Sequence, residues 1–220
     1  MDPADLPPTA AFLEFSQNLA YARNLVGGGE ALASVGATKL DVTDIFRAAL
    51  VQGVSAFDHW LYRESVQRAV ELIQDPGAKR PEKFKKLTVT VELFENVHHH
   101  EVPLDQAFRE RAEQFFSSVL SPNPRKIQEA FAYLVPGRIW PKVAKALTDS
   151  RQDGVEITDG VVVARLGQIV DRRNSIAHES DRDLTSPTGK RSISPESVLS
   201  DIDWIEMTAA ALLTVVKSSS

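Results

Sequence analysis

The segment DRRNSIAHE, residues 171–179, contains an arginine and a histidine whose side chains could do chemistry together. At 100° per residue on a helix, Arg173 falls about 20° from Leu166 and about 40° from Ile169, so it lies on an apolar row. A merely solvating arginine is not expected there. A guanidinium keeps its positive charge, whereas an imidazole exchanges a proton near neutral pH. Arg173 and His178 therefore offer a fixed cation and a general acid or base.

His178 lies on a different row of the same predicted helix. Gly167, Asp171 and Asn174 share that row, so the row is a polar stripe. Because Gly167 has no side chain, another helix could come close to this stripe. On an ideal helix, Arg173 and His178 are about 140° apart around the axis and roughly 7.5 Å apart along it. A shared site would need the long arginine side chain, a helix end that unwinds, or a second subunit.

Both residues also have structural interpretations. Arg173 could pair with a buried carboxylate such as Glu64, which lies on the row of Phe57 and Leu61 in a long upstream helix. In that place Glu64 could instead orient Arg173 for function. His178 could stabilise the carboxyl end of its helix through the helix dipole, which is a common role for histidine.

Other basic residues are candidate substrate contacts. Arg172 points about 100° away from Arg173, the ordinary place for a surface charge. Lys190 and Arg191 lie in the polar connection after the motif, and we include all three basic residues as candidates for contacting substrate. Residues 78–87 hold five Lys or Arg against one Glu, and this stretch could touch phosphates or simply form a solvated loop.

Composition excludes several classes of site and surface. The chain has no cysteine, and the consecutive residues His98, His99 and His100 point in different directions on a helix or strand, so we expect no metal site. No glycine-rich phosphate loop, Ser-His-Asp arrangement or paired carboxylates stand out, and no cofactor is expected. A net charge of -5 argues against non-specific coating of nucleic acid. Any contact with nucleic acid must therefore be local.

The chain reads as an ordinary globular protein of the cytoplasm. Its 220 residues are 43% hydrophobic and 25% charged, near globular averages. The acidic, proline-bearing amino terminus does not fit a secretion signal. The apolar run 209–216 is much shorter than the roughly 20 residues that a membrane span needs. We therefore expect neither secretion nor membrane insertion.

The hydrophobic pattern predicts an all-α helical bundle. We expect residues 1–40 to form a helical extension, with a helix over 10–26 that ends at a hinge of three glycines, and residues 41–220 to form the main domain. The β-branched run 88–91 has no partner strand, so a helical or irregular connector is favoured. The expected helices of the main domain begin near Asp41, Pro103, Arg125, Trp140, Asp159 and Pro195, and the last two should pair as a hairpin.

The motif and its flanks resemble the HEPN superfamily, whose signature is an arginine, four to six intervening residues and a histidine, commonly with a polar residue directly after the arginine. Residues 173–178, RNSIAH, fit with four intervening residues and with Asn174 in the polar position. Together with WPKV at 140–143 and the helix 166–178, they look like the branch called RiboL-PSP-HEPN, over about residues 125–217. The wider context is more specific than the Arg-x4-His string, which arises often by chance.

This resemblance implies a metal-independent endoribonuclease with a composite site across a homodimer. His178 would move a proton, Arg173 would stabilise charge on the phosphorane, and Asn174 would hydrogen-bond the imidazole or the phosphate. It also implies RNA as partner, a role in toxin or antiviral defence systems, and a cognate antitoxin or defence partner. The alternatives are a non-catalytic HEPN module that binds RNA, a nucleotide or a protein, and a purely structural helical protein, which leaves Arg173 on its apolar row unexplained.

Overall fold

The structure, a computed structural model, describes residues 8–36, 41–151, 153–186 and 188–219. These residues form eight α-helices, one short 3-10 helix and no strand, which confirms the all-α class. The helices are α1 (Ala10–Ser34), α2 (Val42–Gln74), α3 (Val91–His98), α4 (Leu104–Val119), α5 (Pro124–Phe131), α6 (Ile139–Asp149), α7 (Asp159–Glu179) and α8 (Pro195–Ser218), with η2 (Phe84–Lys86) before α3. Among the described residues, none of the helices has the length and apolar character needed to cross a membrane.

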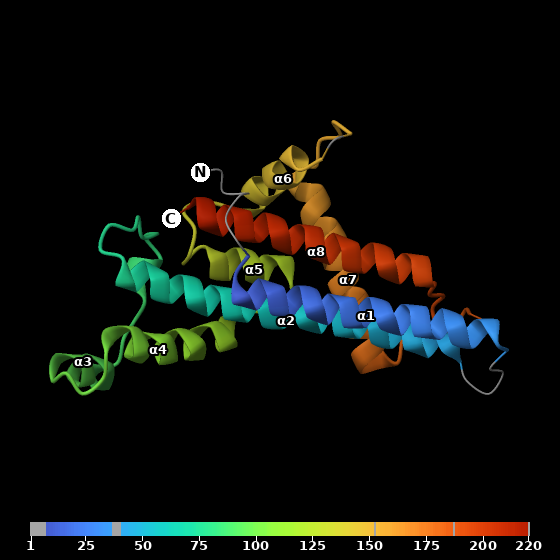
Figure 1. The fold of residues 1–220 in the computed structure, drawn as a ribbon, viewed down its shortest axis with the longest axis horizontal. Coiled ribbons are helices and arrows are strands. Elements are labelled where there is room, and N and C mark those ends of the chain that lie inside the picture. Colours follow the sequence, from blue (N-terminus) through green and yellow to red (C-terminus); the bar gives the residue numbers. More distant parts are fainter. Residues whose placement is uncertain (1–7, 37–40, 152, 187, 220) are drawn as a thin grey trace.

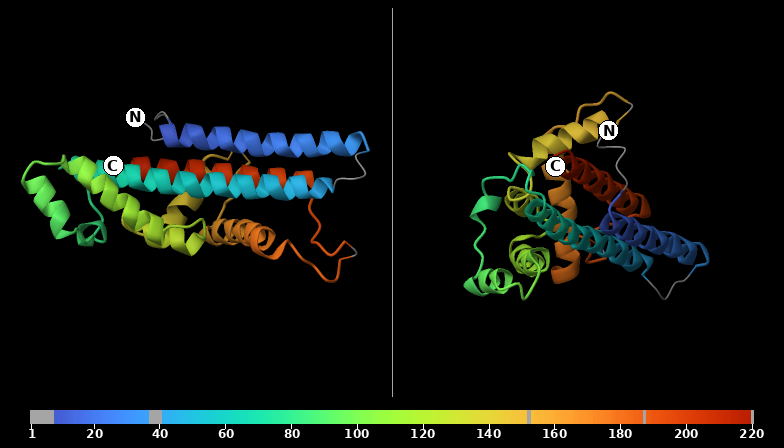
Figure 2. Two further views of the ribbon diagram at one scale, coloured as in Figure 1. Left: turned by 90° about the horizontal axis from the view of Figure 1, so that it is seen from below. Right: turned by 60° about the vertical axis from the view of Figure 1, so that its left-hand side comes forward.

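Three long helices, α1, α2 and α8, run side by side along the molecule (Figure 1). The shorter helices α4 and α7 lie on the side of α2 that faces away from α1, and α3 extends from one end beside α4 (Figure 2). Helix α8 contacts α2, α1 and α6, so many of its side chains are buried. The hydrophobic core consists of the apolar side chains that these helices pack against one another.

The last two helices do not form the expected hairpin. Helix α7 crosses the direction of the long helices, and α8 packs mainly on α2, α6 and α1 (Figures 1 and 2). The buried face of α8 is wider than one neighbouring helix can cover, since Ala211, Leu213 and Val215 are buried as well as Ala209 and Leu212. The long connection after α7 leaves α8 free to take this direction.

Helix starts agree well with the sequence. The hydroxyl of Thr158 caps α7 by accepting from the backbone of Val161, and Ser194 forms a reciprocal capping box with Ser197 at the start of α8. Helix α3 is not among the expected helices; Thr90 caps it, and the β-branched run 88–91 leads into it as a connector, as predicted. Capping side chains accept hydrogen bonds from backbone amides only two or three residues away. A short stretch of sequence is therefore enough to predict where these helices start.

The predicted end of the first helix is wrong. Helix α1 runs through all three glycines to Ser34, and its buried residues join the same core as α2 and α8. A Cβ added at Gly29 would lie 2.6 Å from Cε1 of the buried Phe46 ring. Gly29 therefore permits close packing of α1 on α2, and this contact offsets the low helix propensity of glycine. The sequence pattern alone could not show that contact.

Two alanine substitutions in α1 should have opposite effects on stability. Gly28→Ala meets no atom within 4 Å and should stabilise the protein by about 0.5–1 kcal/mol, since glycine is a poor helix former. Gly29→Ala should destabilise it by about 1–3 kcal/mol, because the new methyl group overlaps the Phe46 ring. Urea unfolding of both variants measures the difference. Equal effects would show that Gly29 is not needed for packing.

Candidate functional site

The motif occupies the last turns of α7, where the helix is firmly terminated. Upstream, α7 is anchored in the core by Val162, Leu166, Ile169 and Val170. At its end, Ser180 and Asp181 both adopt the left-handed conformation, with φ of 54°. The backbone amide of Asp181 donates to the carbonyl of residue 175 at 3.0 Å. The chain therefore turns sharply just after His178 instead of fraying.

Arg173 is half-buried at the end of the apolar row, as its position predicted. Its Nη1 donates to Oδ1 of the neighbouring Asn174 at 3.1 Å. Its Nε is buried and has no hydrogen-bond partner among the described residues. A buried donor without a partner costs free energy, so this guanidinium is not fully satisfied by its own chain.

Asp58 of α2 lies near Arg173. Burial raises the pKa of the Asp58 carboxyl, and the positive charges of Arg173 and His59 oppose that rise. The acidic neighbour of Arg173 is therefore Asp58, which is six residues from the expected Glu64 and on another side of α2.

Glu64 is engaged elsewhere. The hydroxyl of Thr9, the residue that caps α1, donates to Oε2 of Glu64 at 2.7 Å. Glu64 is buried, and burial raises the pKa of its carboxyl. The described residues show no contact between Glu64 and Arg173, so the expected orienting role is not supported, and Glu64 serves to join the start of α1 to α2.

His178 is exposed in the last turn of α7. Within the described parts of the chain, no residue hydrogen-bonds or pairs with its imidazole, and no contact links it to Arg173. The face that carries Gly167 is open as well, since a Cβ added there would meet nothing within 4 Å. The single chain thus presents Arg173 and His178 separately, as the helical geometry predicted.

Arg172 is part of a buried ionic cluster and is not the surface charge that we expected. Its Nη2 binds Oδ2 of Asp181 at 2.8 Å, and the Nε of Arg47 binds the same oxygen at 2.7 Å. Asp181 is fully buried and only 6% of Arg47 is exposed. Arg172 also donates to the carbonyl of Ser192 at 3.0 Å. The cluster joins the end of α7 to the start of α2 and to the chain before α8.

The other basic candidates differ in how available they are. Lys190 binds the carboxylate of Asp44 at 2.6 and 2.9 Å, so its charge is already paired. The carbonyl of Arg191 accepts from Arg47 at 2.6 Å, whereas the Arg191 side chain is exposed. Of the three predicted substrate contacts, only Arg191 leaves its charged group free of a hydrogen bond or ion pair within the described residues.

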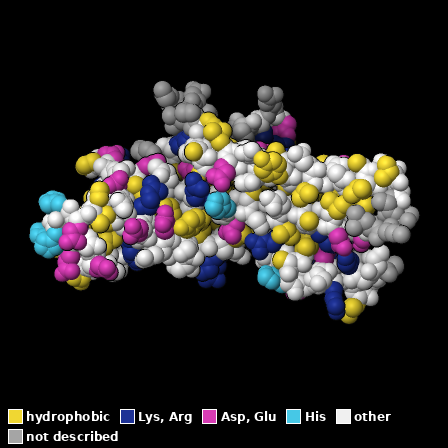
Figure 3. Space-filling view, turned by 60° about the horizontal axis from the view of Figure 1, so that its bottom comes forward, with side chains coloured by type: hydrophobic (Ala, Val, Ile, Leu, Met, Phe, Trp, Pro, Cys, Tyr) yellow, Lys and Arg dark blue, Asp and Glu magenta, His cyan; other side chains and the backbone are white. Residues whose placement is uncertain are grey.

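The positive stretch 78–87 is also largely committed to structure. Arg80 donates to two backbone carbonyls, Lys85 pairs with Glu82, and Lys83 lies 5.5 Å from the centre of the Tyr133 ring. Figure 3 shows Lys and Arg interspersed with Asp and Glu on the face it presents. That face has no broad positive surface for a nucleic acid.

The histidine triplet ends α3, where the ring of His98 stacks on Phe94 with centroids 5.6 Å apart. Across the described ranges, no three His, Cys, Asp or Glu residues come together in a way that could hold a metal ion.

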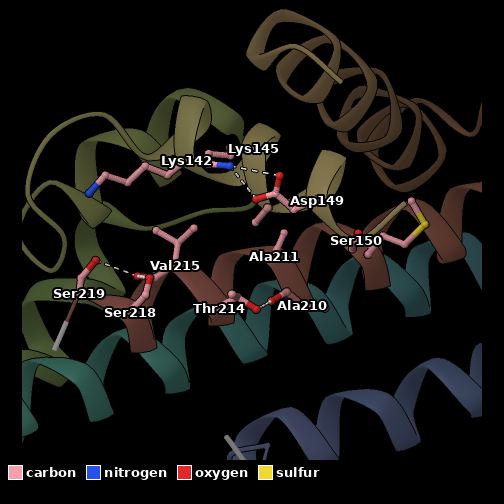
Figure 4. A pocket seen from close by; sticks show the side chains of 12 residues that line it. Lys142, Lys145, Asp149, Ser150, Ala210, Ala211, Thr214, Val215, Ser218 and Ser219 are labelled. Carbon is pink, nitrogen blue, oxygen red and sulfur yellow. Dashed lines mark hydrogen bonds and ion pairs between the residues drawn. The ribbon is translucent and has the colours of Figure 1, made fainter. Parts of the chain in front are cut away.

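A sizeable groove lies away from the motif. It has a volume of about 700 Å³ and runs between α6 and α8 (Figure 4). Lys145 at its rim pairs with Asp149, and Lys142 donates to the carbonyl of Pro136. No residue of the motif lines this groove, so its size does not make it the candidate active site.

Comparison with known proteins gives no family: no protein-family model, curated protein or solved structure matches this chain significantly. The interpretation of the motif therefore depends on its residues and their geometry.

Sequence reasoning missed Arg47 and Asp181. For Arg47 a signal was present, because it precedes Leu50, Val54 and Phe57 at spacings of three, four and three and so lies on the apolar row of α2. Arg173 was identified as a charged residue on an apolar row, and the same criterion identifies Arg47. For Asp181 the sequence carries no comparable signal, since its burial depends on residues far away in the chain.

Removing the charge of Asp181 should destabilise the protein strongly. Asp181→Asn removes the buried anionic partner of Arg47 and leaves it only the exposed Asp44, which should cost about 3 kcal/mol. Glu179→Gln is the matched control, because Glu179 is exposed and should change stability by less than about 0.5 kcal/mol. Thermal and urea unfolding measure both. A neutral Asp181→Asn variant would contradict a structural role for the cluster.

Proposed function

We propose that this protein is a metal-independent endoribonuclease of the HEPN type, cutting RNA at a site shared by two copies of the chain. The observation that carries the proposal is the state of Arg173. Its guanidinium is half-buried on a core row, yet its Nε has no partner among the described residues. Its Nη2 is not buried and makes no hydrogen bond to any described residue, so an anionic group could bind there.

The chemistry needs one proton carrier and one fixed cation. In the cleavage step the 2′-hydroxyl oxygen attacks the phosphorus, its proton passes to a base, and the bond to the 5′-oxygen breaks as that oxygen gains a proton. The imidazole of His178 is assigned this acid/base role, in which it accepts the proton of the 2′-hydroxyl and returns it to the leaving 5′-oxygen. The guanidinium of Arg173, held by Asn174, stabilises the extra negative charge on the phosphorane oxygens. The products are a 2′,3′-cyclic phosphate and a 5′-hydroxyl.

The requirement for two copies comes from the separation of the two residues. In one chain Arg173 is half-buried against α2 while His178 is exposed beyond it, and nothing links them among the described residues. The open face at Gly167 offers space for a second α7. Facing copies of α7 would bring Arg173 of one chain toward His178 of the other, in a symmetric dimer.

A second candidate function is a non-catalytic HEPN module that binds RNA, a nucleotide or a protein partner. It is favoured by one observation: within the described residues, the imidazole of His178 has no hydrogen bond to orient it. Orientation of that ring by a third group is usual in acid/base sites.

As a ribonuclease, the protein would suit a toxin or antiviral defence system, with an antitoxin or defence partner restraining it.

Cleavage of RNA should survive removal of metal ions. Purified protein in excess chelator should still cut mixed RNA and leave 2′,3′-cyclic phosphate ends. His178→Ala should lower the rate by about 10² to 10⁴ without lowering the melting temperature, because the side chain is exposed. Arg173→Lys should also lose most activity, since an ammonium lacks the planar fork of donors. Products with 5′-phosphates, or full activity in His178→Ala, would rule out this mechanism.

Mixing two inactive variants tests the shared site. Arg173→Ala and His178→Ala, exchanged into mixed dimers, should recover about a quarter of wild-type activity, since half the dimers are mixed and each holds one intact site. A Cβ added at Gly167 meets no atom within 4 Å, so Gly167→Leu should fold normally but weaken dimerisation and cleavage together. Light scattering gives the mass. A strict monomer that cleaves RNA, or mixtures that stay inactive, would contradict the composite site.

A further inference from the structure

A small pocket lies between α2 and α4, and one of its lining residues, Asp58, is near Arg173 of α7. Its volume is about 380 Å³, within the range of small-ligand pockets, and it is open to solvent on one side. The residues that line it include Ser55, Asp58, His59, Tyr62, Phe116 and Leu120. It thus combines aromatic and aliphatic surface with several polar groups in one place.

Several polar groups of this pocket have no partner among the described residues, whereas His59 lies 3.9 Å from the carboxylate of Glu14. The Asp58 carboxylate, half-buried, makes no hydrogen bond to any described residue, and neither do the hydroxyls of Ser55 and Tyr62. A partly desolvated carboxylate normally has donors around it, because leaving it without them costs free energy. Burial raises the pKa of Asp58 for this reason. An unpaired acid in a pocket is a candidate for ligand binding.

The position of the pocket ties it to the motif. Arg173 is near enough to Asp58 for its charge to lower the pKa of that carboxyl. The Nη2 of Arg173, which is neither buried nor hydrogen-bonded within the described residues, is suited to an anion, and the free carboxylate of Asp58 is suited to hydrogen-bond donors. A nucleotide offers both groups, a phosphate and a base.

We infer that this pocket binds the nucleobase next to the phosphate held by Arg173, and that Asp58 selects guanine. The inference rests on the proposed ribonuclease function, for which it names the substrate preference. A carboxylate only accepts hydrogen bonds, and the Watson–Crick edge of guanine presents two adjacent donors, N1–H and the N2 amino group. Adenine, cytosine and uracil do not present two adjacent donors there.

The remaining lining suits a planar ring. Single-stranded RNA is commonly read by stacking an unpaired base on an aromatic side chain while its edge is hydrogen-bonded. Tyr62 and Leu120 are half-buried in the pocket wall, and the fully buried Phe116 lies behind them. Asp58, between Ser55 and Tyr62 along α2, is placed to meet the edge of a base that stacks there.

Binding of mononucleotides to the full-length protein tests the pocket without requiring cleavage. Guanosine, adenosine, cytidine and uridine monophosphates are titrated separately and followed by calorimetry and NMR. Guanosine monophosphate should bind at least about tenfold more tightly than the other three. Asp58→Asn replaces one accepting oxygen by a donor and should abolish that preference. Asp149→Asn, the same change in the distant α6–α8 groove, should leave it intact.

The outcomes separate this inference from the ribonuclease proposal. Equal binding of the four nucleotides, no binding, or a guanine preference that persists in folded Asp58→Asn would overturn the pocket assignment. Guanine-selective binding lost in Asp58→Asn, by a wild-type protein that cuts no RNA, would support the pocket and reject the ribonuclease. If RNA is cut without regard to guanine and Asp58→Asn cuts the same positions, the ribonuclease stands and the pocket assignment fails. Unchanged melting temperature of Asp58→Asn confirms that the variant is folded.

Discussion

The bond between Arg47 and Asp181 is the constraint on which the rest of the candidate site depends. It joins the start of α2 to the left-handed turn that ends α7, and the two residues are 134 positions apart in the chain. Arg172 binds the same carboxylate oxygen, so the end of the motif helix is fixed both to α2 and to itself. Arg47 holds Asp181, and Arg173 lies near Asp58, so the last turns of α7 are placed next to α2. The position of the end of α7 in turn determines where Arg173 and His178 lie.

Much of the fold could be predicted because its signals are local. The long helix α2 and the starts of α7 and α8 follow from spacing of apolar residues and from capping side chains, which act within a few residues. The three glycines of α1 show where this reasoning stops. Their low helix propensity is real, but the approach of Gly29 to Phe46 is a contact between helices that no local pattern contains. Tertiary packing overrides a propensity of about 1 kcal/mol without difficulty.

In the candidate site, too, some features could be predicted from local sequence and others could not. A charged residue on an apolar row marks a guanidinium that the fold must accommodate, and this criterion identified Arg173 and would have identified Arg47. The partners of such residues are not local. Glu64 was a reasonable partner for Arg173 from its row on α2, yet the direction in which α7 crosses α2 places Asp58 near it instead. Arg172, expected at the surface, is drawn inward because Asp181 follows the helix in a left-handed turn.

The distance along the chain between Arg47 and Asp181 has a consequence for how the protein is made. Synthesis proceeds from the amino terminus, so α2 is complete while the carboxylate that Arg47 needs does not yet exist. Pairing requires closure of a loop that contains α3 to α7, and such long closures form late in folding. The end of α7 therefore becomes ordered only after residue 181 has left the ribosome. The proposed ribonuclease would gain its active geometry only after residues 47–181 have all been made.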